Sequence, residues 1–178
     1  MFDSEQNYIH NRRLSLSVAE DNNGLIIHQR RLRGWRFGAH GSDYNGCGWI
    51  AAYNALLLLG RPADAAELIR ELEGGLLIGG TLGVAPSALT RLLRRHGCTV
   101  RTSYGLRHAA PPRTGRVLIY GFLRRGLGGG HFVAAQRRDG AYSFYNDRGV
   151  FHGGWDQFAA REPARAHALL LIDAEGAR

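Results

Sequence analysis

A cysteine at the start of an apolar helix is the feature that most constrains the fold of this chain. Cys47 follows a polar turn, lies between Gly46 and Gly48, and opens a run that is apolar on most faces. A helix without a polar face has to be covered on all sides, so we expect residues 47–59 to form a buried central helix. Unpaired N–H groups and the helix dipole at such a start favour a thiolate. The alternative for Cys47 is a small buried hydrophobic residue.

The pattern of apolar residues places helices in the first half of the chain and strands in the second half. Helices are predicted at 47–59, 62–73 and 87–96, with a short one from 154, and strands at 98–104, 116–122, 131–136, 141–145 and 167–172. An Asn-Gly turn predicts an N-terminal hairpin, and the segment from 30 to 45 is expected to be a loop. Helices followed by an antiparallel sheet are typical of an α+β domain.

The length of 178 residues predicts one domain over 1–178, with the N-terminal hairpin at 14–30, a helical part at 47–97 and an antiparallel sheet at 98–173. The N-terminus lacks the pattern of a signal peptide, and no apolar run is long enough to cross a bilayer. We therefore expect a cytoplasmic protein with no membrane partner. Two cysteines are too few for a disulfide scaffold, and Cys98 is expected in the core.

The net charge of +8 comes from arginine alone, because all 23 basic residues are arginine and none is lysine. The arginines occur as scattered pairs along the chain, and no nucleic-acid-binding motif accompanies them. A nucleic-acid-binding surface normally shows a clustered basic patch. We therefore expect an arginine-rich solvated surface and no nucleic-acid partner.

Among the eight histidines, His131 is the best candidate for the base that a nucleophilic thiol requires. It opens a predicted strand directly after Gly130, and the following hairpin returns the chain to Asn146 and Asp147. Antiparallel pairing would bring an amide or carboxylate oxygen beside the imidazole, where it orients the ring. The alternative for His131 is a histidine that caps a strand. The alternative for Asn146 and Asp147 is a polar turn of the kind that often follows a strand.

At these residues the sequence resembles the papain-like cysteine peptidases, and most of all the leader-peptide (double-glycine) peptidase domains of bacteriocin exporters and their free-standing bacterial relatives. The resemblance spans residues 40–150 and rests on three motifs: Asn45-Gly46-Cys47-Gly48 opens a helix, Gly130-His131-Phe132-Val133 opens a strand, and Asn146-Asp147 closes the next strand. It implies a papain-like α+β fold in which N-terminal helices, with a buried nucleophile helix, pack on an antiparallel sheet.

The resemblance also implies roles for individual residues. Cys47 would be the nucleophile and His131 the general base and acid. Asp147 fits the acidic third member of the exporter type, which we prefer, and Asn146 fits the asparagine of the papain type. Trp49 and Gly130 are candidates for substrate binding, although Trp49 is also a candidate core aromatic.

One departure from the family pattern concerns the oxyanion hole. The family places a glutamine several residues before the cysteine, and residues 40–45 contain none. Asn45 is left as a candidate amide donor, together with the Cys47 backbone N–H. Losing one oxyanion donor typically costs about a hundredfold to a thousandfold in rate.

From these residues we expect a thiol hydrolase that cleaves a peptide or related acyl bond of a peptide or protein substrate through a thioester, without a cofactor. The alternatives are a catalytically lapsed peptide-binding protein of the same fold and an acyltransferase. A metal site at Cys47, His131 and Asp147 is disfavoured, because no closely spaced Cys/His pair supports it. Substrate specificity and the oligomeric state stay open.

Overall fold

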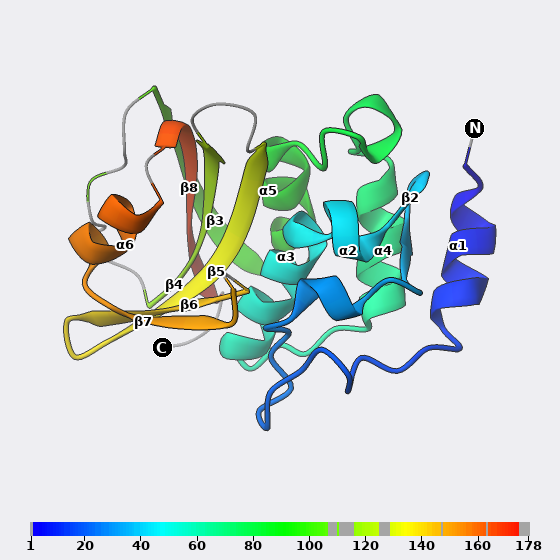
Figure 1. The fold of residues 1–178 in the computed structure, drawn as a ribbon, viewed down its shortest axis with the longest axis horizontal. Coiled ribbons are helices and arrows are strands. Elements are labelled where there is room, and N and C mark those ends of the chain that lie inside the picture. The colour runs from blue at the N-terminus through cyan, green and yellow to red at the C-terminus, as the bar shows by residue number, and fades with distance from the viewer. Residues whose placement is uncertain are drawn as a thin grey trace.

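The computed structural model describes residues 2–106, 110, 116–124, 129–146, 148–162 and 164–174. The helices are α1 (Ser4–Asn11), η1 (Gln29–Arg31), α2 (Ser42–Asn45), α3 (Cys47–Leu58), α4 (Ala65–Glu73), η2 (Ile78–Gly80), α5 (Pro86–Arg95) and α6 (Trp155–Arg161). The strands are β1 (Arg36–Phe37), β2 (His40–Gly41), β3 (Cys98–Gly105), β4 (Val117–Arg124), β5 (Gly130–Arg138), β6 (Ala141–Tyr145), β7 (Val150–Gly153) and β8 (Ala164–Ala174). The predicted order of helices before strands is present (Figure 1).

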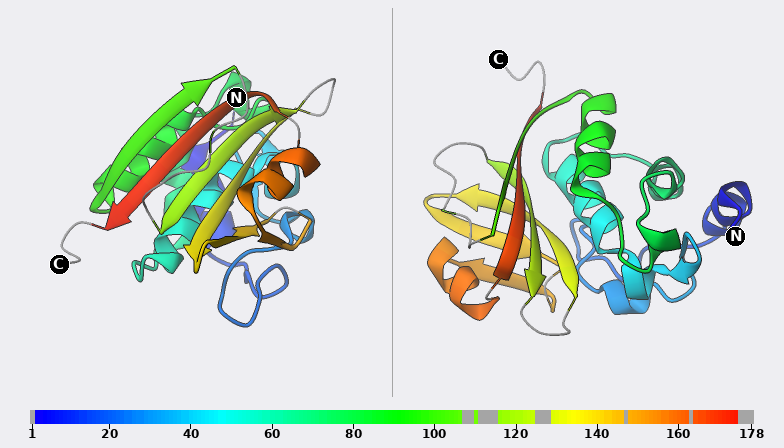
Figure 2. Two further views of the ribbon diagram at one scale, coloured as in Figure 1. Left: turned by 90° about the vertical axis from the view of Figure 1, so that its left-hand side faces the viewer. Right: turned by 90° about the horizontal axis from the view of Figure 1, so that it is seen from above.

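An antiparallel sheet separates two hydrophobic layers. Its strand order is β3-β8-β4-β5-β6-β7, so the last strand of the chain lies between two earlier ones. Helices α3, α4 and α5 lie on one side of the sheet and α6 lies on the other (Figures 1 and 2). Within the described residues, no helix has the length and hydrophobicity needed to cross a bilayer. Strand β5, between β4 and β6, contacts α3 of the helical layer.

Helix α3 is the centre of the larger layer, as its apolar sequence predicts. Most of its residues are buried in the hydrophobic cluster that also contains Leu68 of α4, Leu92 of α5 and Ile119 of β4. It contacts β5 and β4 on one side and α4 and α5 on the other. A helix surrounded in this way has its N-terminus fixed relative to the sheet.

Two glycines, Gly48 of α3 and Gly121 of β4, leave room for neighbouring side chains in the core around α3 and β5. A Cβ at Gly48 would lie 2.2 Å from Cγ1 of Val84 and 3.8 Å from Cδ2 of Phe132. On the strand side, a Cβ at Gly121 would lie 2.4 Å from the Phe132 ring. Val84 therefore fills the space beside Gly48, and the Phe132 ring fills the space over Gly121 while lying within ordinary contact distance of α3. His131, the neighbour of Phe132, is thereby brought to the start of α3.

The second layer is an aromatic cluster under α6. Phe144 of β6 stacks on Phe158 of α6 with ring centroids 3.8 Å apart, and Tyr120 contacts Trp155 and Phe158. Helix α6 is held at its start by the Gln157 side chain, which accepts from the Gly154 N–H at 2.9 Å. This layer anchors β6, and with it the residues that follow β6.

The hairpin predicted over 14–30 is reduced to one antiparallel bridge between Glu20 and Ile26, and the rest of this segment contains no strand. The Ile26 backbone pairs instead with a side chain of α3: its N–H donates to Asn54 Oδ1 and its carbonyl accepts from Asn54 Nδ2, both at 2.8 Å. The Asn54 amide thus fixes this short turn to α3 through the Ile26 backbone groups that the bridge leaves unused.

Residues 30–45, predicted as a loop, contain the β1–β2 ribbon, α2 and part of η1. Helix α1 was also not predicted, because its buried contacts are polar and leave no apolar pattern. The Asn7 amide donates to Glu73 Oε1 at 2.7 Å and to the Gly38 carbonyl at 2.9 Å. These two bonds attach α1 to α4 and to the ribbon.

We expect Gly48→Ala to lower the free energy of unfolding by about 1–3 kcal/mol, because the new methyl group overlaps Val84 in a packed core. Urea unfolding measures this change. Gly74→Ala is the control, since a Cβ there meets nothing within 4 Å. In the Gly48→Ala/Val84→Ala double variant the overlap is relieved, so the loss should be smaller than the sum of the single losses. Equal stability of the Gly48→Ala and Gly74→Ala variants would contradict the close approach.

Candidate active site

The structure brings Cys47 and His131 together, from the first residue of α3 and the second residue of β5. The imidazole is hydrogen-bonded to the thiol, and the backbones of Phe132 and Gly48 also hydrogen-bond to the sulfur. Burial raises the pKa of Cys47, but these hydrogen bonds and the charge of His131 outweigh it, so the pKa lies below its ordinary value. The pair therefore favours a thiolate beside an imidazolium.

A one-turn helix, α2, leads directly into α3 and sets the direction of the Cys47 side chain. The Gly46 N–H donates to the Ser42 carbonyl at 2.9 Å, and the Ile50 N–H donates to the Gly46 carbonyl at 3.0 Å. Gly46 has no room for a side chain, because a Cβ there would lie 2.4 Å from the Ser42 oxygen. The polar turn predicted before Cys47 is thus helical, and its glycine is required by packing.

The imidazole is oriented by a backbone carbonyl. Nε2 of His131 lies 2.8 Å from the carbonyl oxygen of Asn146, so this nitrogen carries the proton and donates it. That bond leaves Nδ1 to face the thiol. The sequence predicted a side-chain oxygen in this role, from Asp147 or Asn146. Asp147 lies outside the described residues, and Asn146 acts on the imidazole through its main chain.

The Asn146 side chain is held by Gln29 of η1. The Gln29 N–H donates to Asn146 Oδ1, and Asn146 Nδ2 donates to Gln29 Oε1, each at 3.1 Å. Gln29 Nε2 also donates to the Asp43 carbonyl at 3.3 Å, which connects it to the turn before Cys47. Asn146 is buried and has a φ of +70°, a conformation that asparagine tolerates better than most residues. These bonds fix the peptide that carries the carbonyl.

Sequence reasoning did not find Gln29. It precedes Cys47 by much more than the family's glutamine, and its link to Asn146 spans 117 positions. No local pattern marks such a contact. The sequence shows only that Gln29 is a polar amide shortly after the apolar residues 25–27, which does not indicate its partner.

Two other predicted site residues are engaged elsewhere. Asn45 is buried, and its amide donates to the carbonyls of Phe37 at 2.9 Å and Gly80 at 3.1 Å, so both N–H groups are used inside the protein. Trp49 is fully buried, and its indole N–H donates to Ser42 Oγ at 3.1 Å. This geometry provides no oxyanion donor at Asn45 and no substrate contact at Trp49, which is the core aromatic of the alternative interpretation.

Gly130 and His131 line an open hollow of about 650 Å³. Its other walls are residues 27–31, Asp43, Tyr44, Asn146, Arg148 and Gly149. Cys47 is buried and is connected to this hollow through His131, which lines the hollow and bonds to the thiol. Among the described residues, no three His, Cys, Asp or Glu side chains gather in a way that could hold a metal ion.

Comparison with known proteins identifies the fold. The peptidase domain of Streptococcus ComA, a bi-functional ABC transporter involved in a quorum-sensing pathway, is similar with a TM-score of 0.50 and 10% identity, over 74% of this chain and 93% of that domain. Pseudomonas avirulence protein AvrPphB has a TM-score of 0.45 and 10% identity, over 73% and 92%. No family model and no curated protein matches the sequence. The predicted papain-like α+β fold is confirmed by the ComA domain.

We expect Gln29→Ala to slow the alkylation of Cys47 by iodoacetamide about fivefold near pH 6. The variant leaves a buried Asn146 amide without its acceptor, a loss of about 1 kcal/mol or more that loosens the imidazole. Gln29→Glu keeps that acceptor and should stay close to the wild type. Urea unfolding separates this effect from a general loss of stability. Equal rates in the wild type and in Gln29→Ala would show that the Gln29 bond does not position the imidazole.

Proposed function

We propose that this protein is a thiol hydrolase of the cysteine-peptidase type, in which Cys47 attacks the carbonyl carbon of a peptide or related acyl bond. The observation that carries the proposal is the hydrogen-bonded Cys47–His131 pair with a lowered thiol pKa. The open hollow beside His131 and the papain-like fold support it.

The first half of the reaction forms a thioester. The Cys47 thiolate bonds to the carbonyl carbon, and the electron pair of the C=O bond moves onto oxygen. When the carbonyl re-forms, the C–N bond breaks and the leaving nitrogen takes the proton from Nδ1 of the His131 imidazolium. The Asn146 carbonyl accepts from Nε2 throughout, which keeps the ring in place and stabilises its charged form.

The second half hydrolyses the thioester. His131 is now neutral, and Nδ1 takes a proton from water while the water oxygen attacks the thioester carbon. The C–S bond breaks, the acid is released and the sulfur leaves as a thiolate beside the imidazolium. In both halves the oxyanion forms near the first turn of α3, where the helix dipole and the backbone N–H groups favour negative charge.

A peptide-binding protein without catalysis is the second candidate. It is favoured by Asn45, whose amide is used for internal bonds and does not serve the oxyanion. Such a protein would hold a peptide in the hollow beside His131 without cleaving it.

The pH dependence of Cys47 alkylation tests whether the Cys47 thiolate and the His131 imidazolium form a pair. Since the Cys47 pKa lies below its ordinary value of about 8.5, the alkylation rate of the wild type should persist to lower pH than that of an ordinary thiol and fall as the pH drops through the lowered pKa. In His131→Ala the hydrogen bond and the charge that lower the Cys47 pKa are lost, while burial still raises it. The thiolate should then form only above the ordinary pKa of a thiol. If both proteins show the same profile, the thiolate–imidazolium pair does not exist.

Hydrolysis distinguishes the two candidates. Fluorescein-labelled casein should be cleaved by the wild type, and cleavage should be abolished by Cys47→Ala and by His131→Ala. A wild type that alkylates fast near pH 6 and yet cleaves no protein or peptide, while Cys47→Ala binds peptides as well as the wild type, would support the binding protein and contradict the hydrolase.

A further inference from the structure

Exposed arginines gather around the hollow that contains His131. Arg30 and Arg31 belong to η1, and Arg148 belongs to the turn that follows β6. Asp43 is the one carboxylate among the described residues that line this hollow, and its Oδ2 lies 3.9 Å from Arg33 Nε. Among the described lining residues, three arginines thus accompany a single carboxylate, which lies near Arg33.

These arginines keep free hydrogen-bonding capacity. Within the described residues, no carboxylate lies within 4.0 Å of the Arg30 guanidinium. Arg31 donates from Nη1 to the Val18 carbonyl at 3.2 Å, and Arg148 lies 3.7 Å from Glu162 Oε1. A guanidinium has five N–H donors in a fork that matches a carboxylate. Each of the three side chains therefore has donors left for an anionic ligand.

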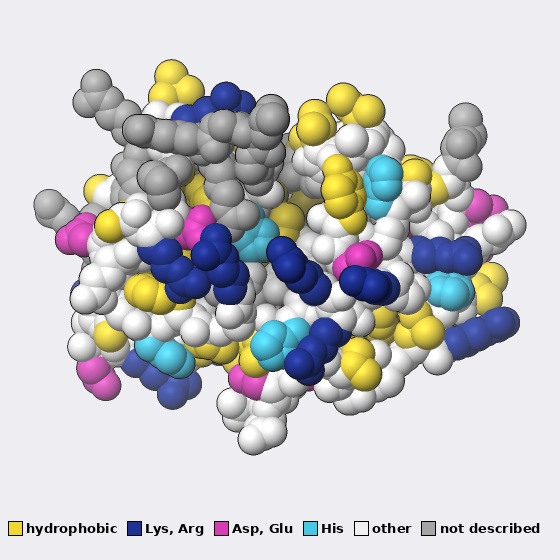
Figure 3. Space-filling model, viewed as in Figure 1, with side chains coloured by type: hydrophobic (Ala, Val, Ile, Leu, Met, Phe, Trp, Pro, Cys, Tyr) yellow, Lys and Arg dark blue, Asp and Glu magenta, His cyan; other side chains and the backbone are white. Residues whose placement is uncertain are grey.

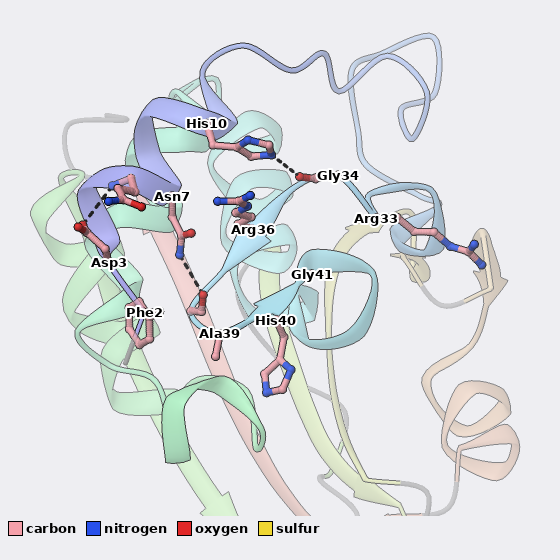
Figure 4. A pocket seen from close by; sticks show the side chains of 12 residues that line it. Phe2, Asp3, Asn7, His10, Arg33, Gly34, Arg36, Ala39, His40 and Gly41 are labelled. Carbon is pink, nitrogen blue, oxygen red and sulfur yellow. Dashed lines mark hydrogen bonds between the residues drawn. The ribbon is translucent and has the colours of Figure 1, made fainter.

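A second basic hollow lies next to the first. It measures about 930 Å³ and lies between α1 and the β1–β2 ribbon, where His10 and Arg36 enter it (Figure 4). Its carboxylate among the described lining residues is Asp3, which is engaged in capping α1. Arg33 lines this hollow and pairs with Asp43 of the first, so the two hollows are adjacent.

The space-filling view shows the same feature on a larger scale. Arginine side chains form a band across the face shown in Figure 3, from the sheet, over the region of α2, to α1, with few acidic side chains between them. Charge of one sign along a hollowed surface attracts and orients an extended ligand of the opposite sign. The face is thus complementary to a chain of negative charges.

We propose that the substrate of the His131 hollow is an acidic polypeptide segment. Its carboxylates pair with Arg30, Arg31 and Arg148 beside the scissile bond, and its continuation follows the hollow of Arg33 and Arg36. Arginine–carboxylate pairs of this kind are charge-assisted and directional. The cleavage of this segment rests on the proposed hydrolase function, whereas its binding depends on the arginines alone.

Binding is measured on the full chain carrying Cys47→Ala, which cannot cleave the probe. The probes are a fluorescein-labelled peptide rich in glutamate and the same peptide with every glutamate replaced by glutamine. Fluorescence anisotropy should show the glutamate peptide binding about tenfold or more tightly at low salt, and the difference should shrink as salt is added. Adding Arg30→Gln and Arg148→Gln together should weaken the binding of the glutamate peptide about threefold to tenfold. Arg91→Gln, at an exposed position of α5 that lines neither hollow, is the control and should change nothing.

Three results would overturn the proposal. The first is equal binding of the two peptides. The second is a loss of glutamate-peptide affinity in Arg91→Gln as large as in the Arg30→Gln/Arg148→Gln variant. The third is binding of a single-stranded DNA oligonucleotide of the same charge as tightly as the glutamate peptide. The last result would indicate a surface for any polyanion.

Cleavage by the chain with Cys47 intact separates this proposal from the proposed function. Faster cleavage of the glutamate peptide than of the glutamine peptide, lost in Arg30→Gln/Arg148→Gln, supports both. Equal cleavage of the two peptides supports the hydrolase and overturns the acidic substrate. Charge-selective binding with no cleavage of either peptide contradicts the hydrolase and supports the acidic ligand.

Discussion

The packing of helix α3 against strand β5 is the contact on which the rest of the site depends. It places the first residue of one element beside the second residue of the other, and so sets the Cys47–His131 pair. Close packing here depends on Gly121 of β4, which leaves space for the Phe132 ring, and on Gly48 of α3, which leaves space for Val84. Substitutions in this part of the core therefore affect the site, since a shift of one packed side chain moves the imidazole relative to the sulfur.

Elements with a strong apolar pattern could be predicted from the sequence, and elements held by polar contacts could not. Helix α3, helix α5 and the buried strand β4 lie within a few residues of their predicted bounds, because α3 and β4 are continuous apolar runs with polar or glycine residues at their ends and α5 has one apolar face. Helix α1 was missed because it is attached through the Asn7 amide. The hairpin over 14–30, predicted from alternation and an Asn-Gly turn, is shortened to a single antiparallel bridge, and the Ile26 backbone groups bond to the Asn54 side chain of α3.

The same distinction applies to the site. Cys47 and His131 could be proposed from their local context, because each begins an element of recognisable pattern. The acceptor for the imidazole could not, since a main-chain carbonyl has no residue type that marks it. The gathering of Arg30 and Arg148 was equally hidden, because these residues are far apart in the sequence and meet only where the turn after β6 lies beside η1. Contacts of high sequence separation are set by topology, which local patterns do not encode.

The span of 117 positions between Gln29 and Asn146 has a consequence for the newly made chain. Contacts between distant segments form late, because closing a long loop is entropically unfavourable until both ends have folded partners. During synthesis α3 emerges well before β5 and β6, so Cys47 then lacks the partner that lowers its pKa and behaves as an ordinary thiol. The reactive sulfur is therefore a product of the completed fold, and a nascent or partly unfolded chain carries no activated nucleophile.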